Sequence, residues 1–333
     1  MKGGGVLLSK SKIVLLFTLI LTFSLFTTGC FFLDFIFGPD PDEEKEVEED
    51  EGQVEEEPYD DEDMRETMFY MLDDNDNIVP IVRPIEWTEG IATKTLSKMS
   101  KSPQNIDFWE GTNLSPPLPS ETQVKGMTID DGLARVNFTE ELLDVQGEKE
   151  DKVLSSVIYT LTEFDSVDEV ELMVGGEFID TLPAGADVSS YLVRDGLNIE
   201  VTSQARAADS QDAVTLYFIS NDKKYLVPVT RYIPATDEIE GNAIYELMEG
   251  PSSESGLVSY ISPELTVNNV SIEGSKIIID VSNLSDDPES QEEALKQLYY
   301  TLIELDKVNE VEITVDGEEP SIDVNLSRIN FAT

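Results

Sequence analysis

A stretch of twenty residues occurs twice in this chain, and this repetition limits the folds open to it more than any other feature. Residues 157–176, VIYTLTEFDSVDEVELMVGG, return without a gap at residues 298–317, LYYTLIELDKVNEVEITVDG. Eleven of the twenty aligned positions are identical, whereas unrelated windows would share about one or two. The chain therefore contains an internal duplication, and we expect the two copies to fold alike.

Each copy has the pattern of a helix followed by a strand. Apolar residues spaced three, four and three positions apart predict one buried helix face, at positions 154, 157, 161 and 164 and again at 295, 298, 302 and 305. Apolar residues at every second position predict the strands, 170–174 and 311–315. Gly176 and Gly317 then supply a turn.

The duplication extends upstream into two matching hairpin patterns, residues 67–85 and 215–233. Pro80 and Pro228 hold the same place in the second strand, where proline favours a sheet edge. A helix and two strands should follow each hairpin, at 88–99, 124–129 and 134–138 and at 237–249, 267–272 and 276–281. The long helices should begin near Glu148 and near Asp287-Pro288. We predict an α+β fold of two tandem similar domains, each a single small mixed sheet with two helices on one face.

The copies lie 141 to 148 residues apart, which is too long a period for a solenoid. Each copy is long enough to bury its own core. We predict a first domain at residues 65–200, a small and polar linker at 201–212, and a second domain at 213–333.

The amino terminus has the pattern of a bacterial secretion signal. Three lysines precede an apolar run at residues 13–26, which is shorter than the roughly 20 residues that span a bilayer. Cys30 is the only cysteine, and Gly29-Cys30 resembles a lipobox, with Thr27 where leucine is usual. We predict a signal peptide at residues 1–29 and lipid on Cys30. The alternative is ordinary secretion with one unpaired thiol, and no disulfide can form within the chain.

An acidic segment follows the lipidation site. Sixteen acidic residues stand against Lys45 alone between residues 40 and 63. Self-repulsion and the lack of apolar side chains predict that residues 30–64 form a disordered tether, with calcium binding as the alternative. The net charge of the whole chain is −47, which makes nucleic acid an unfavourable partner and suits a source living in concentrated salt.

The sequence offers little for catalysis. It contains no histidine, and its one cysteine is the predicted lipid site, so the usual general base and thiol nucleophile are missing. Residues 250–256, GPSSESG, have Glu254 where a nucleophile elbow requires glycine. We therefore predict no enzymatic activity, no catalytic residue, no cofactor and no metal.

Three groups of residues are open to a functional interpretation as well as a structural one. The hairpin tip at 73–77, DDNDN, begins like a calcium loop, but no glycine stands at its sixth position and Pro84 stands at its twelfth. The acidic pairs 163/165 and 304/306 are interpreted as helix ends leading into strands. Trp87 and Trp109 are interpreted as core or rim aromatics, with ligand stacking as the alternative.

The repeated residues, taken together, resemble a known family. The resemblance rests on five short motifs: Gly256-Leu257 with Ser259, Ile261 and Pro263; Asn137–Thr139 or Asp280–Ser282; Tyr159–Leu161 and Tyr300–Leu302; Val-x-x-Val before the last strand; and Leu247 with Gly250-Pro251. This set is similar to the GerM-type sporulation and germination lipoproteins with two tandem GerMN domains. The Leu-x-x-Gly-Pro motif is degenerate in the first repeat, around residues 96–103.

The resemblance implies a fold similar to the ring-building domains of the apparatus that links mother cell and forespore. It implies a non-catalytic envelope lipoprotein on the outer face of the cytoplasmic membrane, in the intermembrane space during sporulation. The implied partners are the membrane, through Cys30, other envelope or channel proteins, and further copies in a ring. An actinobacterial lipoprotein type shares the domain, so the domain does not by itself prove sporulation. The alternative function is a ligand-binding envelope lipoprotein, for cations or cell-wall fragments, unrelated to sporulation.

Overall fold

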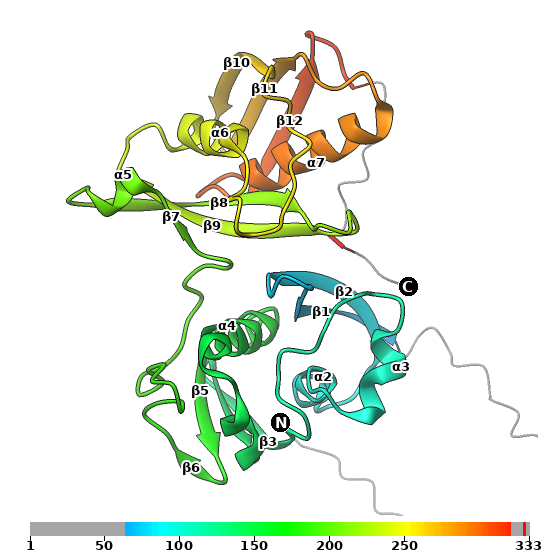
Figure 1. Cartoon of the computed structure of the whole chain (residues 1–333), viewed down its shortest axis with the longest axis vertical. Coiled ribbons are helices and arrows are strands. Elements are labelled where there is room, and N and C mark those ends of the chain that lie inside the picture. Colours follow the sequence, from blue (N-terminus) through cyan, green and yellow to red (C-terminus); the bar gives the residue numbers. More distant parts are fainter. Residues whose placement is uncertain (1–63, 321–328, 331–333) are drawn as a thin grey trace, which may run out of the picture. The chain divides into compact units, whose positions relative to one another are not determined.

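The computed structural model describes residues 64–320 and 329–330, apart from the side chain of Glu148 (Figure 1). These residues all belong to one compact unit, Tyr59–Thr333. The predicted signal peptide, Cys30 and the acidic tether up to residue 63 lie outside the described residues. Within the described part, no helix is both long and apolar enough to cross a bilayer.

The first repeat consists of a hairpin, two main helices and a mixed sheet. Its elements, in chain order, are β1 Met64–Leu72, β2 Ile78–Glu86, α2 Ile91–Lys98, η2 Pro103–Asn105, α3 Ile106–Trp109, β3 Val124–Asp130, β4 Leu133–Phe138, η3 Glu140–Asp144, η4 Gly147–Lys149, α4 Glu150–Leu161, β5 Glu169–Val174 and β6 Glu177–Phe178. β1 pairs antiparallel with β2. The second sheet has the order β3-β4-β5-β6, in which only β4 and β5 are parallel.

The second repeat has the same plan, preceded by a short strand and a helical turn. Its elements are β7 Glu200–Val201, α5 Ser203–Arg206, β8 Gln211–Ile219, β9 Leu226–Pro234, α6 Ile239–Glu249, β10 Thr266–Glu273, β11 Lys276–Ser282, α7 Pro288–Ile303 and β12 Glu310–Val315. The hairpin sheet has the order β7-β9-β8, and the mixed sheet has the order β10-β11-β12 with β11 and β12 parallel. Asp287 caps α7 by accepting from Ser290 N–H at 3.0 Å, as its Asp-Pro start signal predicts.

The α+β class and the mixed sheet beneath two helices are confirmed, but the prediction of one sheet per repeat is wrong. Each hairpin forms a sheet of its own. Helix α4 contacts both β1 and β5, and α7 contacts both β8 and β12, so the long helix of each repeat lies between two sheets (Figure 1). A helix in that position must bury two faces.

The apolar spacing did not predict the second buried face of the long helix, because this face includes small polar residues. Ser156 and Thr160 on α4 are fully buried beside the apolar stripe. The Thr160 hydroxyl accepts from Tyr70 N–H on β1 at 3.2 Å, and the Thr301 hydroxyl accepts from Tyr217 N–H on β8 at 3.0 Å. Each long helix is therefore tied to its hairpin by the threonine of the repeated Tyr-Thr-Leu motif.

Proline in the second hairpin strand has different surroundings in the two repeats. β2 lies at a sheet edge, as Pro80 predicts, whereas β9 has a strand on both sides. The strand β7 pairs only with Arg231 and Tyr232, away from Pro228, so the missing N–H of this proline costs no ladder bond. The predicted linker 201–212 carries the helical turn α5, whose Ala205 is fully buried. The predicted domain boundaries stay predictions.

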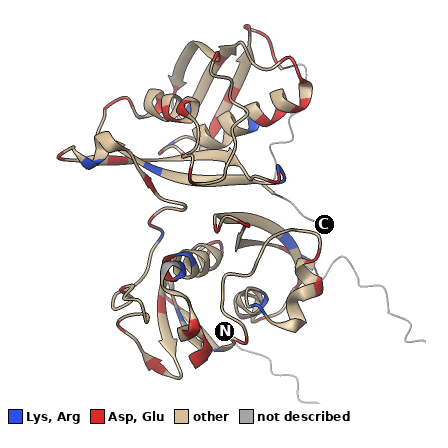
Figure 2. Ribbon diagram, viewed as in Figure 1, with Lys and Arg blue, Asp and Glu red and all other residues tan. Residues whose placement is uncertain are grey.

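Acidic side chains are spread over the elements of both repeats (Figure 2). Residues 64–333 carry a net charge of about −34 of the total of −47. Added salt shortens the range of this repulsion to about 10 Å at 0.1 M. We expect the melting temperature to rise by at least about 5 °C between low and molar sodium chloride. A non-ionic solute at matched osmolality is the control, and a melting temperature independent of salt would contradict the argument from charge.

Candidate functional site

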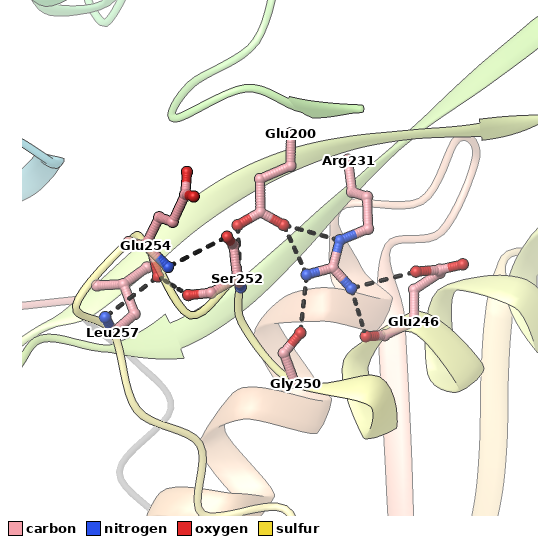
Figure 3. Close-up of polar contacts among 8 residues, drawn as sticks. Glu200, Arg231, Glu246, Gly250, Ser252, Glu254 and Leu257 are labelled. Atoms are coloured by element: carbon pink, nitrogen blue, oxygen red, sulfur yellow. Dashed lines mark hydrogen bonds and ion pairs between the residues drawn. The ribbon is translucent and has the colours of Figure 1, made fainter. Parts of the chain in front are cut away.

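Arg231 lies buried on β9 and joins three segments of the second repeat (Figure 3). Its guanidinium donates to the Glu200 carboxylate on β7 at 2.6 and 2.9 Å. It also donates to the carboxylate and the carbonyl of Glu246 on α6, at 3.1 and 2.8 Å, and to the Gly250 carbonyl at 2.8 Å. Both carboxylates are themselves largely shielded from water. The cluster therefore consists of one buried cation between two shielded anions.

The Leu-x-x-Gly-Pro motif supplies the carbonyls of this cluster. Helix α6 ends at Glu249, and Gly250 caps it at φ +80°, a left-handed conformation that favours glycine. The last carbonyls of a helix lack partners within the helix, and a cation at this end is favourable. Glu200 also accepts from Ser252 N–H at 3.2 Å. Arg231 thus fixes the end of α6 and the following loop against β7 and β9.

The first repeat holds its corresponding arginine differently. Arg83 on β2 donates to the Phe108 carbonyl and stacks on two rings, with its Cζ 4.9 Å from the centre of Phe108 and 5.9 Å from that of Trp109. Burial lowers the Arg83 pKa. Aromatic faces thus replace the carboxylates where the motif is degenerate. Sequence reasoning assigned no role to either arginine, although their matching positions in the two hairpins were a usable signal.

Trp109 and Trp87 have different environments. Trp109 is buried, packs edge-on against Phe69 at 5.1 Å between ring centres, and donates to the Lys98 carbonyl at 2.7 Å. It is a core residue of the first repeat. Trp87 is 56% exposed, so it belongs to the surface.

Two asparagines join the hairpins of the two repeats. The Asn198 carbonyl oxygen accepts from Ile78 N–H at 2.8 Å, and its amide donates to the carbonyls of Ile78 and Pro228, both at 2.8 Å. The Asn330 carbonyl oxygen accepts from Leu226 N–H at 2.8 Å, and its amide donates to the carbonyls of Leu226 and Pro80, at 2.6 and 2.7 Å.

We call these two asparagines, with the carbonyls of Pro80 and Pro228, the asparagine clasp. Its two halves are equivalent, one in each repeat. Each asparagine pairs with the hairpin of its own repeat and with the proline of the other. Proline has no N–H to donate, so the two strand edges cannot form a regular ladder at these positions. The asparagine amides supply the missing donors. The sequence signal was weak, because an asparagine between two apolar residues, 197–199 and 329–331, is all that the two sites share.

Replacement of Asn198 by alanine is expected to lower the free energy of unfolding by about 1–3 kcal/mol, because buried backbone groups of Ile78 and Pro228 lose their partners. Urea unfolding followed by circular dichroism measures this change. Asn269→Ala is the control, because this asparagine is exposed on β10 and should change the free energy by less than about 0.5 kcal/mol. Equal effects of the two substitutions would contradict the clasp.

The acidic hairpin tip is organised by its own side chains. The Asp73 carboxylate accepts from the backbone N–H groups of Asn75 and Asn77, both at 2.8 Å, and from the Asn77 side chain at 2.9 Å. It thus has the contacts of a polar turn. Among residues 64–320 and 329–330, no group of three histidine, cysteine, aspartate or glutamate side chains could hold a metal ion.

In each of the two acidic pairs, 163/165 and 304/306, the glutamate contacts the hairpin. Glu163 accepts from the Tyr70 hydroxyl at 2.9 Å, and Glu304 accepts from the Tyr217 hydroxyl at 2.8 Å. Each of these glutamates therefore binds the hairpin of its own repeat, although all four acidic residues of the two pairs are exposed. Cys30, the predicted lipid site, lies outside the described residues.

Comparison with known proteins agrees with this architecture. The spore germination protein GerM of Bacillus subtilis (strain 168) is 29% identical over 267 residues, which are 77% of this chain and 72% of that protein. The solved structure of the tandem GerMN domains of the sporulation protein GerM from Bacillus subtilis superposes with a TM-score of 0.68 at 26% identity, over 81% of this chain and all of that one.

A family model described as "Germane: Sporulation and spore germination" matches residues 68–180 and 215–321. These two segments correspond to the two repeats and cover well over half of the chain. Both contain the hairpin, the paired helices and the mixed sheet described above. This chain therefore belongs to the Germane family of sporulation and spore germination proteins, with two tandem domains of the GerMN type.

Proposed function

We propose that this protein is a non-catalytic envelope lipoprotein, acting as a structural or assembly component of the apparatus between mother cell and forespore and later in germination. The observation that carries this proposal is that both repeats match the family model and together match tandem GerMN domains. Fold alone does not give function. The proposal therefore also depends on how the polar groups of the described part are used.

Several buried or shielded polar side chains hold the fold together. Arg231 joins β7, β9 and α6, and Asp73 shapes a turn. Glu150 is buried at the start of α4, where it accepts from the N–H groups of Ala184 and Ala186 at 2.5 and 3.1 Å. Such an arrangement supports a scaffold.

Sheet edges are the surfaces through which this scaffold would dock. β3 and β10 hold corresponding edge positions in the mixed sheets of the two repeats. β10 also exposes apolar side chains, with Val270 36% and Ile272 50% accessible. An edge strand offers unpaired backbone groups, and exposed apolar residues add to a binding surface. Other envelope proteins, or further copies of this chain in a ring, are the proposed occupants.

The proposed location is the outer face of the cytoplasmic membrane, with lipid on Cys30 and residues 30–64 as the tether. We expect the parent protein to incorporate a fatty-acid analogue and to fractionate with membranes, because its cysteine lies four positions after the end of the apolar run. Cys30→Ala should abolish both properties. Equal labelling of the alanine variant would contradict the anchor, and Thr28→Ala is the control that should still be labelled.

Crosslinking in sporulating cells, followed by purification of this protein, tests the assembly role. We expect envelope proteins to be recovered with the parent protein and lost from unlinked controls. We also expect cells lacking the protein to fail in assembly without accumulating a substrate. Production of the protein only outside sporulation would contradict the proposal.

The second candidate function is a ligand-binding lipoprotein. A cavity of about 350 Å³, lined by tyrosines from both repeats, favours it. Calorimetry with cations and cell-wall fragments tests this function. Tight binding of a small ligand, together with no envelope partner after crosslinking, would favour ligand binding over assembly.

A further inference from the structure

The first repeat carries a row of lysines along α2. The chain has only 22 lysines and arginines against 69 acidic residues, yet Lys94, Lys98 and Lys101 fall within eight positions. Their spacings of four and three residues place them on one side of the helix and its end. The buried residues of α2 lie on the other side: Ile91, Ala92, Thr95 and Leu96. We call these three lysines the α2 lysine row.

The duplication shows that the fold does not require this row. When the repeats are aligned on the hairpin prolines, two of the lysines correspond to glutamates of α6: Lys98 to Glu246 and Lys101 to Glu249. The core position between them is kept, since Met99 corresponds to Leu247 and both are fully buried. The two helices therefore share a core face and differ in the sign of the charge on their surface.

Two lysines of the row have no carboxylate partner among the described residues. Lys94 pairs with Glu86 at 2.8 Å. Within residues 64–320 and 329–330, neither Lys98 nor Lys101 forms an ion pair. The Lys98 amine lies 4.9 Å from the centre of the Phe108 ring. These two cations are therefore not used in ion pairs that hold the first repeat together.

Two exposed apolar side chains flank the row. Trp87 is 56% exposed and directly follows the glutamate that pairs with Lys94. Ile106 is 66% exposed and directly follows Asn105, whose amide donates to two carbonyls between the lysines, at 2.8 and 3.0 Å. The second repeat has Ala235 at the position of Trp87. Lysines beside an exposed tryptophan and a large aliphatic side chain suit the interface of a bilayer.

We propose that the α2 lysine row, together with Trp87 and Ile106, binds the headgroups of an anionic lipid bilayer. The presence of a bilayer rests on the proposed function, in which lipid on Cys30 holds this protein at a membrane. Residues 31–63 connect the lipid to the first repeat, and 33 residues span at most about 120 Å. The first repeat follows this connection directly, so it lies within reach of the membrane.

The contact has to be local, because the net charge of −47 is repelled by an anionic surface. Screening acts over about 10 Å at 0.1 M salt, so headgroups respond mainly to the charges that lie against them. Asp107 and Glu110 are exposed next to the row and offset part of its charge. Trp87 and Ile106 must therefore contribute to binding. The lipid anchor adds to this contact, because tethering raises the local concentration of the bilayer.

Flotation with lipid vesicles tests the surface. The chain from residue 38 onward is used without lipid, because it omits the apolar stretches 13–26 and 31–37 and keeps the whole compact unit. We expect it to float with vesicles of phosphatidylglycerol and phosphatidylcholine. Affinity for vesicles of phosphatidylcholine alone should be lower by about tenfold. Absence of flotation, or equal binding to both kinds of vesicle, would overturn the proposal.

A charge-matched control separates the row from general electrostatics. Lys98→Glu with Lys101→Glu introduces the residues of the second repeat, so the fold should persist, and circular dichroism checks this. Vesicle affinity should fall by about tenfold or more. Lys223→Glu with Lys307→Glu makes the same change of charge at exposed positions of the second repeat and should change affinity by less than about twofold. Equal loss from both double variants would overturn the lysine row.

Brominated phosphatidylcholine in the same vesicles reports whether Trp87 enters the bilayer. Bromine quenches a tryptophan only at close range, and Trp109 is buried in the core. We therefore expect quenching of the parent protein and none of Trp87→Phe. Flotation without quenching would show that another face of the protein meets the lipid, which overturns the proposal.

The labelling of Cys30 and the flotation assay fail independently. Flotation without fatty-acid labelling would reject the proposed anchor and keep the lysine row. Labelling without flotation would keep the anchor and overturn the row. If the parent does not float and Lys98→Glu with Lys101→Glu loses an envelope protein that crosslinks to the parent, the row binds a protein, which overturns the lipid site.

Discussion

Leu302→Ala is expected to lower the free energy of unfolding by about 2–5 kcal/mol. The Leu302 side chain is fully buried on α7, which packs between the hairpin strand β8 and the strand β12. Removing three carbon atoms there forfeits burial and leaves a cavity that surrounding elements fill only in part. Urea unfolding followed by circular dichroism measures the change, provided the slope with denaturant stays constant.

The duplication supplies a matched counterpart for this experiment. Leu161 has the same position on α4 and is also fully buried, so Leu161→Ala should cost a similar amount. The two effects should add, because each helix packs against the hairpin of its own repeat. Ile272→Ala, at a half-exposed position of β10, is the control with an expected change of about 0.5 kcal/mol. A cost for Leu302→Ala no larger than that of the control would contradict the proposed core.

Arg231→Met is expected to destabilise the protein by about 3–5 kcal/mol, because it leaves two shielded carboxylates without their cation. The side chains of Glu200 and Glu246 are only 18% and 15% exposed, so water compensates for little of the loss. The end of α6 also loses the donors to the carbonyls of Glu246 and Gly250. Denaturant unfolding again gives the magnitude.

A surface arginine provides the comparison for the buried one. Arg135 pairs with Glu171 at 2.8 Å, and its side chain is 35% exposed. Arg135→Met should therefore cost about 0–1 kcal/mol. Adding Glu200→Gln to Arg231→Met should recover part of the stability, because one uncompensated charge is removed. If Arg231→Met and Arg135→Met lower the free energy of unfolding by the same amount, the buried Arg231 does not organise the second repeat.

The repeated element pattern could be predicted from the sequence because local chemistry determines it. The apolar stripe through Leu161 and Leu302, the alternation in β5 and β12, and the Asp287-Pro288 start signal each depend on neighbours a few residues away. The motifs through Tyr300 and Gly250 also indicated the family, which the family match confirms. The number of sheets could not be predicted, because the second buried face of α4 includes the polar residues Ser156 and Thr160 and so has no apolar pattern in the sequence.

The sequence by itself determined the duplication, the α+β class, the family and the acidic surface, since these follow from residue spacing and composition. Only the tertiary structure decided which polar residues meet: Arg231 with Glu200, Asn198 with the Pro228 carbonyl, and Tyr217 with Glu304. These partners lie 30 to 87 positions apart in the chain. Their pairing depends on how sheets and helices stack, and a single sequence has no local pattern that records it.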